Sequence, residues 1–250
     1  MKTILITGCS SGFGREIARR FLERDWRVIA TMRTPRTDVL PASDRLRVLR
    51  LDVTDPDSIR KAVDAAGPLD VLVNNAGIGA AAPFEVTSAR LARELFETNT
   101  FGTMAVTQAV LPQFRQRRGG VVVNVTSTVT LMSLPMLSMY TASKAAVNAF
   151  TESMALELAP LGIRVRLVLP GRAPDTRFGD NASAGGRGQG LDHPAYADLA
   201  RGFMAQLGST TTPVTHATDV AEAVWYAATD AASPMRIPAG EDAVALAKAA

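Results

Sequence analysis

The sequence contains very little cysteine. Its 250 residues include a single cysteine, Cys9, so no disulfide can form within the chain. A chain of this length can bury a core that needs neither a disulfide nor a metal ion for stability. The composition, 47% hydrophobic and 20% charged residues, is that of a globular domain. We therefore expect no metal site, and a cytoplasmic location, since reducing compartments suit such chains.

Long hydrophobic runs are also missing. No stretch approaches the roughly 18 consecutive apolar residues that a membrane-spanning helix needs. The apolar segment 1–6 is too short for a signal peptide and runs directly into Thr7-Gly8, so it predicts a first strand. The net charge is +3, and the densest basic cluster, residues 115–118, is better explained as a solvated helix end. Neither a membrane nor a nucleic acid is expected as a partner.

Short apolar segments alternate with segments of helical periodicity. We expect strands at residues 3–7, 27–31, 46–51, 69–73, 120–125, 163–169 and, briefly, 236–237. Helices are expected at residues 13–24, 55–66, 88–117 (broken or kinked at Pro112), up to 159 around Tyr140, and 217–230. Repeated β–α units of this kind predict an α/β fold, a doubly wound parallel sheet of Rossmann type that binds ligands beyond its carboxyl ends.

A glycine-rich turn follows the first expected strand. Its sequence, Thr7-Gly-Cys-Ser-Ser-Gly-Phe-Gly14, has the spacing Gly-x-x-x-Gly-x-Gly. Glycines there allow a tight turn and close approach of the backbone to a pyrophosphate, and the following helix N-terminus favours an anion. The turn therefore predicts dinucleotide binding by the residues Gly8, Ser10, Ser11, Gly12, Phe13 and Gly14.

Tyr140 and Lys144 stand four residues apart in an expected helix, so both side chains can face one cleft. A free tyrosine has a pKa near ~10, and a neighbouring lysine charge is expected to lower it. The pair can then donate and accept a proton. The same spacing is common on solvated helix faces, so the pair alone leaves both interpretations open.

Other motifs add to this pair: Asp52-Val53, Asn74-Asn75-Ala76-Gly77, Asn99, Pro170-Gly171, and Ser127 thirteen residues before Tyr140. With the glycine turn and Tyr140-x-x-x-Lys144, they resemble the short-chain dehydrogenase/reductase family in its core, single-domain branch. The resemblance covers nearly the whole chain. It implies one dinucleotide-binding catalytic domain over residues 1–250.

The resemblance implies a catalytic set of Ser127, Tyr140, Lys144 and Asn99. Tyr140 would protonate a carbonyl oxygen or deprotonate an alcohol, and Ser127 would polarise the same oxygen. Lys144 would lower the pKa of Tyr140 and hold the nicotinamide ribose, while the Asn99 backbone would hold a relay water. Taken alone, Asn99 could be a surface helix residue, and Ser127 one of several neighbouring hydroxyls.

The family also implies cofactor contacts outside the glycine turn, made by Asp52, Val53, Asn75, Ala76, Gly77, Tyr140, Lys144, Pro170, Gly171 and Thr176. Asp52 would bind the adenine amino group, although a turn residue is the alternative for it. Four residues separate Gly171 from Thr176, one more than the family usually has, so Thr176 reaches the nicotinamide carboxamide only if the loop bulges.

No acidic residue ends the second expected strand, where one would bind the ribose 2′-hydroxyl of NAD. Arg33 follows that strand instead, and a guanidinium suits a 2′-phosphate, with Arg36 as a second candidate. We therefore expect NADP(H) rather than NAD(H). The alternative is that Arg33 is only solvated.

Residues 172–216 fall where the family places a substrate-covering segment. Their glycines fit either a mobile lid or an ordinary surface loop. Apolar residues there and before Tyr140 indicate a lipophilic substrate, although core packing would explain them almost as well: Met132, Leu134, Met136, Leu137, Tyr196, Leu199, Phe203, Met204 and Leu207. Segments 30–33 and 236–243 resemble relatives that act on steroids, retinoids and other lipophilic carbonyls.

The sequence thus predicts an NADP(H)-dependent carbonyl reductase or alcohol dehydrogenase, associated as a homodimer or homotetramer. One alternative is a catalytically idle NADP(H)-binding sensor or regulator, which would not need the full set of four catalytic residues. A sugar-nucleotide epimerase is a second alternative. The short C-terminal part and the glycine spacing count against it.

Overall fold

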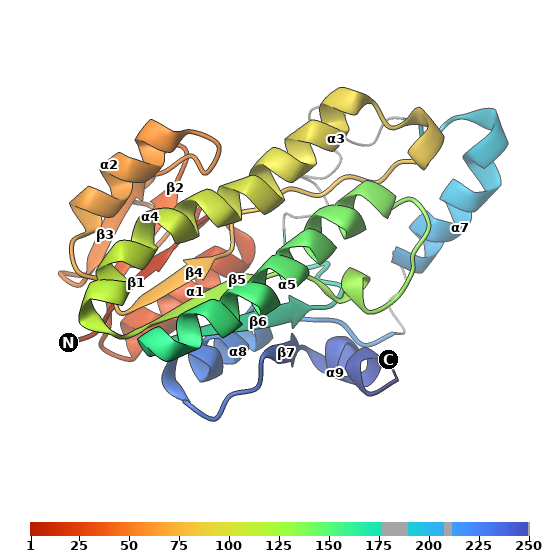
Figure 1. Cartoon of the computed structure of the whole chain (residues 1–250). Helices are drawn as coiled ribbons and strands as arrows, with labels where there is room; N and C mark the ends of the chain where they lie inside the picture. The colour runs from red at the N-terminus through yellow and green to blue at the C-terminus, as the bar shows by residue number, and fades with distance from the viewer. Residues whose placement is uncertain (177–189, 208–211, 250) are drawn as a thin grey trace.

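A single seven-stranded parallel sheet organises the chain, in the order β3-β2-β1-β4-β5-β6-β7 (Figure 1). The computed structural model describes residues 1–176, 190–207 and 212–249. The strands are β1 Thr3–Ile6, β2 Arg27–Met32, β3 Leu46–Arg50, β4 Val71–Asn74, β5 Gly120–Val125, β6 Ile163–Pro170 and β7 Arg236–Ala239. The predicted doubly wound sheet is confirmed.

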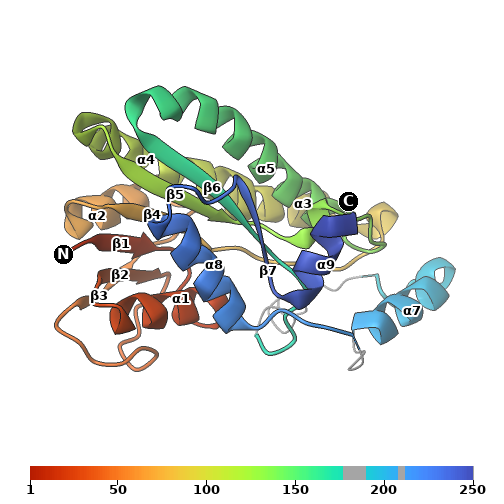
Figure 2. The ribbon, with the colours of Figure 1, turned by 90° about the horizontal axis from the view of Figure 1, so that it is seen from below.

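Helices cover both faces of this sheet (Figure 2). Helices α1 (Gly12–Glu23) and α8 (Ala217–Thr229) cover one face, and α2 (Pro56–Ala66), α4 (Gly102–Arg117) and α5 (Ser138–Leu158) cover the other. Side chains of a strand alternate between faces, so Ile4 and Ile6 join one core and Leu5 joins the other. Burial on both faces explains why the central strands β1 and β4 are mostly apolar, whereas the edge strand β3 carries the exposed Arg47 and Arg50.

The expected long helix over residues 88–117 is divided. It consists of α3 (Ala89–Phe96), a π-helical turn η2 (Glu97–Phe101) and α4, which continues through Pro112 rather than breaking there. π turns are rare and are frequent at functional sites. Here the turn carries Asn99 inward, where it is buried.

Helix α9 (Glu241–Ala249) was not expected from the sequence. The sequence features that indicate the start of this helix are Gly240 directly before it and the acidic residues Glu241 and Asp242 in its first turn. Helix α7 (Ala197–Leu207) lies in the expected substrate-covering segment and carries four of the apolar residues noted there, Leu199, Phe203, Met204 and Leu207. Phe203 is buried, whereas Leu199 and Met204 are half exposed.

The described ranges also contain the single-turn 3₁₀ helices η1 Phe84–Val86, η3 Thr128–Thr130, η4 Ala159–Leu161 and η6 Pro194–Tyr196. Among the described residues, no helix is both long enough and apolar enough to cross a membrane. Cys9 is buried, and burial raises the pKa of its thiol to about 12, so the thiolate is not accessible near neutral pH.

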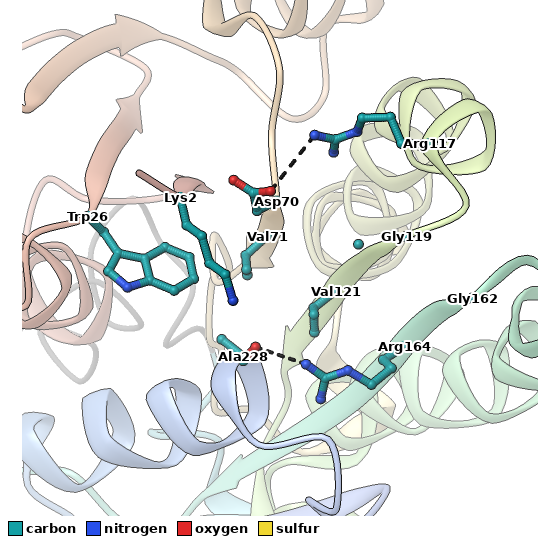
Figure 3. A pocket seen from close by; sticks show the side chains of 11 residues that line it. Lys2, Trp26, Asp70, Val71, Arg117, Gly119, Val121, Gly162, Arg164 and Ala228 are labelled. Atoms are coloured by element: carbon teal, nitrogen blue, oxygen red, sulfur yellow. Dashed lines mark hydrogen bonds and ion pairs between the residues drawn. The ribbon is translucent and has the colours of Figure 1, made fainter.

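A cavity of about 380 Å³ lies at the amino ends of the strands (Figure 3). Lys2, Trp26, Arg117 and Arg164 are among the residues that line it. The C-terminus of α8 lies there, and Arg164 Nη2 donates to the Ala228 carbonyl at 3.0 Å, the stabilising position for a cation. Ligands of open parallel sheets bind beyond the carboxyl ends of the strands, so the functional site is expected at the edge opposite to this cavity.

Candidate functional site

The four predicted catalytic residues meet at the carboxyl edge of the sheet. Ser127 follows β5, caps η3 and accepts a hydrogen bond from the Val129 N–H at 3.3 Å. Tyr140 and Lys144 lie on the first two turns of α5, and both are buried. The solvated-face interpretation of the pair is therefore excluded.

Ser127 and Tyr140 form a side-chain hydrogen bond, which by itself lowers the pKa of the phenol. Burial is the larger effect and raises the pKa of Tyr140 well above its usual value, because the phenolate would be poorly solvated. The predicted lowering of this pKa by Lys144 is therefore wrong for the chain as described. The phenol stays protonated at neutral pH, which is the state that donates a proton.

Lys144 is a buried amine whose Nζ donates to the Val125 carbonyl at 3.1 Å. Burial lowers the pKa of Lys144 to about 8, since the ammonium form loses its hydration. A Cβ placed on Gly77 would lie 3.4 Å from this Nζ, so a glycine at this position keeps the amine uncrowded. Lys144 therefore titrates closer to neutral pH than an exposed lysine.

This shift predicts a pH-dependent stability. Between about pH 8 and 10.5 the unfolded chain binds the Lys144 proton more tightly than the folded chain, so the Lys144 contribution to the free energy of unfolding rises with pH in that window. The rise is roughly 3 kcal/mol at most, because one pKa unit corresponds to about 1.4 kcal/mol. Urea unfolding of wild type and Lys144→Met, measured from pH 7 to 10, checks it.

Lys144→Met should lack the rise, and the exposed Lys248→Met should retain it. Cys9 and Tyr140, whose pKa values are raised by burial, oppose the rise above about pH 9 and pH 10 respectively, so the comparison with Lys144→Met, which retains both groups, isolates the Lys144 contribution. An equal pH slope in wild type and Lys144→Met would contradict the burial of a titrating amine.

Asn99 links the π-helical turn to the rest of the site. Its side-chain oxygen accepts from the Ile78 N–H at 2.8 Å, and its amide donates to the Ile78 carbonyl at 2.9 Å and the Ser143 hydroxyl at 3.0 Å. These contacts exclude the surface-residue alternative. The Asn99 carbonyl, which is the group that the relay water would need, accepts from Thr103 Oγ1 at 2.8 Å.

The glycine turn has the geometry of a phosphate cradle. Gly8 and Gly12 have φ of +76° and +55°, a region that favours glycine. A Cβ on Gly14 would lie 2.3 Å from the Gly8 carbonyl oxygen, so only glycine fits there. Ser11 precedes α1 without a side-chain capping bond, and the first turn of α1 has no acidic residue. The N-terminal amides of α1 therefore suit an anion.

The segment after β4 is fastened to this turn. Thr7 Oγ1 accepts from the N–H groups of Asn75 and Ala76, both at 3.0 Å, and the Asn75 side chain donates to the Thr7 carbonyl at 2.9 Å. This role of the Thr7 hydroxyl was not predicted, because it depends on the pairing of β1 with β4, which brings Thr7 next to Asn75.

Asp52 and Val53 both have structural roles. Asp52 Oδ1 accepts from the Thr54 N–H at 3.0 Å and the Thr54 hydroxyl at 2.8 Å, so the turn role is observed. Its second oxygen remains for an adenine amino group. Val53 packs against Gly102, where a Cβ would lie 2.7 Å from the valine side chain.

Arg33 is exposed and follows β2, as expected. Within the described ranges it forms no ion pair, whereas Arg36 pairs with Asp38 at 2.7 Å. Arg36 is thus already neutralised by a carboxylate. Of the two candidate cations for a 2′-phosphate, Arg33 is the better placed to offer its full charge.

Thr176 lies against the glycine turn. A Cβ on Gly12 would lie 3.5 Å from the Thr176 Cβ. The extra residue after Gly171 is absorbed in a turn in which the Thr176 N–H and hydroxyl both approach the Ala173 carbonyl, at 3.3 and 2.9 Å. The loop therefore bulges and brings Thr176 beside Gly12, while its contact with the nicotinamide carboxamide stays a prediction. The lid expected over residues 172–216 falls in part on 177–189 and 208–211, outside the described residues.

A small cavity of about 10 Å³ lies against Tyr140. It is lined mostly by apolar side chains: Ala80, Ala82, Thr87, Leu91, Leu95, Met136 and Met139. Leu134 and Leu137 pack in the cluster that contains Tyr140. Of the expected lining residues, Met136 is therefore placed as predicted. Leu91 and Leu95 come from α3 and were missed, because their helical periodicity gave no sign of which neighbour α3 contacts.

A family model described as short chain dehydrogenase matches residues 2–185. The chain belongs to the short-chain dehydrogenase/reductase family. Curated relatives include an uncharacterised oxidoreductase of Bacillus subtilis, 42% identical over 68% of this chain and 64% of its own length. A 3-ketodihydrosphingosine reductase of Bacteroides thetaiotaomicron is 39% identical over 71% and 66%. Human retinol dehydrogenase 8 is 37% identical over 68% and 58%. The aligned part thus spans less than two thirds of each relative.

Solved structures agree with this membership. A short-chain dehydrogenase from Streptomyces avermitilis has a TM-score of 0.84 at 35% identity, over 99% of this chain and 91% of its own. One from Burkholderia cenocepacia in complex with NADP has a TM-score of 0.78 at 27% identity, over 99% and 93%. A 3-ketoacyl-(acyl-carrier-protein) reductase from Brucella melitensis complexed with NADH has a TM-score of 0.77 at 26% identity, over 95% and 96%. This short-chain dehydrogenase/reductase therefore has structural neighbours with either nicotinamide cofactor.

Proposed function

We propose that this chain transfers a hydride between NADP(H) and a carbonyl or secondary alcohol of a lipophilic substrate. One observation carries the proposal: a buried, protonated Tyr140 hydrogen-bonded to Ser127, one helical turn from the buried amine of Lys144. A proton donor paired with a hydroxyl is what a carbonyl oxygen needs as it gains negative charge. A sensor would not need this arrangement.

The nicotinamide cofactor supplies the hydride when bound. The glycine turn fits its pyrophosphate, since Gly14 leaves no room for a Cβ and the α1 amides are uncapped by Ser11. In reduction, Tyr140 donates its phenolic proton to the substrate oxygen, and the Ser127 hydroxyl donates a hydrogen bond to the same oxygen. Lys144 holds the ribose, and a water on the Asn99 carbonyl would return a proton to the site.

NADP(H) is preferred to NAD(H) on the charges at the end of β2. Arg33 is exposed and unpaired within the described ranges, and Met32 rather than an acidic residue ends the strand. An acidic residue would repel a 2′-phosphate, whereas a guanidinium can form two charge-assisted hydrogen bonds to it. The structural neighbours do not decide between the cofactors, so the preference rests on these residues.

The lipophilic substrate is supported by the apolar side chains around Tyr140, including Leu91, Leu95 and Met136. Two relatives of the chain are named for reactions of 3-ketodihydrosphingosine and of retinol, both lipids with long apolar parts. Both observations favour a ketone or carbinol joined to an extended apolar chain.

A series of unbranched ketones of increasing length tests the substrate class. The expected result is that kcat/KM with NADPH rises with each methylene, by about fourfold while the chain remains in contact with the protein, because burying one CH₂ contributes about 0.8 kcal/mol. A flat series, or faster turnover of short charged ketones, would refute a lipophilic site. NADPH binding without turnover of any ketone or alcohol would favour the sensor.

We also propose that residues 1–250 act as one catalytic domain and associate as a homodimer or homotetramer through α4 and α5. Leu156 supports this arrangement, because it lies on α5 with 79% of its surface exposed. Sedimentation velocity would measure the assembly, and a monomer at micromolar concentration would contradict it.

A further inference from the structure

Asp242, in the first turn of α9, lies against the loop that leaves β6. Its Oδ2 accepts a hydrogen bond from the Arg172 N–H at 2.7 Å, and its Oδ1 lies 2.7 Å from the Thr215 hydroxyl. Thr215 Oγ1 in turn accepts from the Gly171 N–H at 2.9 Å. The backbone N–H groups of Gly171 and Arg172 therefore both donate hydrogen bonds to side chains from distant parts of the chain.

Two glycines make room for these contacts. A Cβ on Gly171 would lie 2.1 Å from Asp242 Oδ2, so a side chain there would displace the carboxylate. Gly240 has a φ of +102°, and a Cβ on it would lie 2.2 Å from the Thr215 hydroxyl. The contact between the loop and α9 therefore depends on the side chains of Asp242 and Thr215. It also requires glycine at positions 171 and 240, because a larger side chain would not fit at either.

Thr215 also fastens the far end of the expected substrate-covering segment. It is fully buried, and its N–H donates to the Arg172 carbonyl at 2.8 Å. The start of that segment at Arg172 and its end at Thr215 are thus joined directly, and Asp242 holds both. Figure 1 shows α9 following β7 at the carboxyl end of the sheet, next to β6.

We propose that Asp242 and Thr215 are positioning residues that hold Pro170-Gly171 at the place where it borders the nicotinamide ring. The inference rests on the proposed nicotinamide site, because that site gives the loop its role. Hydride transfer requires the donor and acceptor carbons to be aligned, and a misplacement of about 1 Å can cost up to 10²-fold in rate. Neither residue touches the reacting atoms; both act through the backbone of Gly171 and Arg172.

The contribution of Asp242 is its forked shape rather than its charge. The single Thr215 proton can go to the Asp242 carboxylate or to the Ala239 carbonyl at 2.8 Å, but not to both. An asparagine could donate to Thr215 Oγ1 while its oxygen accepts from Arg172, and Thr215 would then donate to Ala239. Asp242→Asn should therefore retain the function that Asp242→Ala loses.

The test compares Asp242→Ala with Asp242→Asn and with Glu241→Ala, which removes an exposed acid from the same helical turn. Hydrogen exchange of the free protein should show the Gly171 and Arg172 amides exchanging at least tenfold faster in Asp242→Ala only. The NADPH dissociation constant, from fluorescence titration, should rise several-fold, and kcat should fall about tenfold or more with less change in the KM of the carbonyl substrate. Asp242→Asn and Glu241→Ala should match wild type within about twofold.

Normal exchange, cofactor affinity and kcat in Asp242→Ala would overturn the inference, as would an equal effect of Glu241→Ala. If Asp242→Ala does not fold, Thr215→Val is the second variant: it removes the acceptor for Gly171 N–H and the hydroxyl proton shared by Asp242 and Ala239, and it should speed exchange at Gly171 with the same losses in NADPH affinity and kcat. Exchange and NADPH affinity are read without a carbonyl substrate, so they decide the role of Asp242 even if the proposed turnover is absent. Failure of the proposed function would instead leave wild type itself inactive.

Discussion

Replacing Tyr140 with phenylalanine is expected to lower kcat for carbonyl reduction by about 10²–10⁴-fold, the usual contribution of a positioned proton donor. The phenol is buried and protonated, and Ser127 is its side-chain partner, so in this account no other group takes over the proton transfer. Steady-state rates of NADPH oxidation on the best ketone of the series would measure the loss.

The same variant should bind NADPH within a few-fold of wild type, because phenylalanine fills the site and leaves the glycine turn intact. Fluorescence titration of NADPH is the matching control, and it distinguishes loss of chemistry from loss of the cofactor site. Near-full activity in Tyr140→Phe would show that the proton comes from elsewhere.

Arg33→Ala should weaken NADPH binding by about 10–100-fold and leave NADH binding nearly unchanged. A hydrogen bond to a charged group contributes about 1.5–3 kcal/mol, which is the free energy expected from a guanidinium on a 2′-phosphate. Dissociation constants of both cofactors, measured at the same ionic strength, would give the ratio directly. Arg33 lies at the surface, so high salt should reduce the effect.

Arg60→Ala provides the matched control, since Arg60 is an exposed arginine on α2 that pairs with Asp57 at 2.9 Å. It should change neither affinity. Arg33→Lys should give an intermediate loss, because an ammonium keeps the charge without the two-pronged geometry. Equal weakening of NADPH and NADH by Arg33→Ala would rule out a role in recognising the 2′-phosphate.

The central strands were predictable because each is short and mostly apolar, and burial on both faces of a parallel sheet requires that composition. The glycine turn was predictable because few other residues fit its backbone: Gly8 has a positive φ, and Gly14 leaves no room for a Cβ. The spacing from Ser127 to Tyr140 placed the proton donor and its partner correctly. These features depend on local sequence or on fixed separations along the chain.

Features that depend on packing between distant segments were not predictable. The direction of the Tyr140 pKa shift follows from burial, which exceeds the effect of any neighbour four residues away. The π-helical turn at Asn99 depends on contacts with Ile78 and Ser143 rather than on helix propensity. The hydrogen bond from the Arg172 N–H to Asp242 joins residues seventy positions apart. Helix α9, which carries Asp242, was not predicted from the sequence.

Transfer of deuterium from NADPH labelled at both hydrogens of the nicotinamide C4 shows whether this protein moves a hydride from the cofactor to a carbonyl carbon. Wild-type protein, labelled NADPH and a long-chain ketone should yield a carbinol that carries one deuterium at the former carbonyl carbon, detected by mass spectrometry, while Tyr140→Phe yields almost none. Bound NADPH with no labelled carbinol from any ketone in the series would contradict the account and favour a nucleotide-binding sensor.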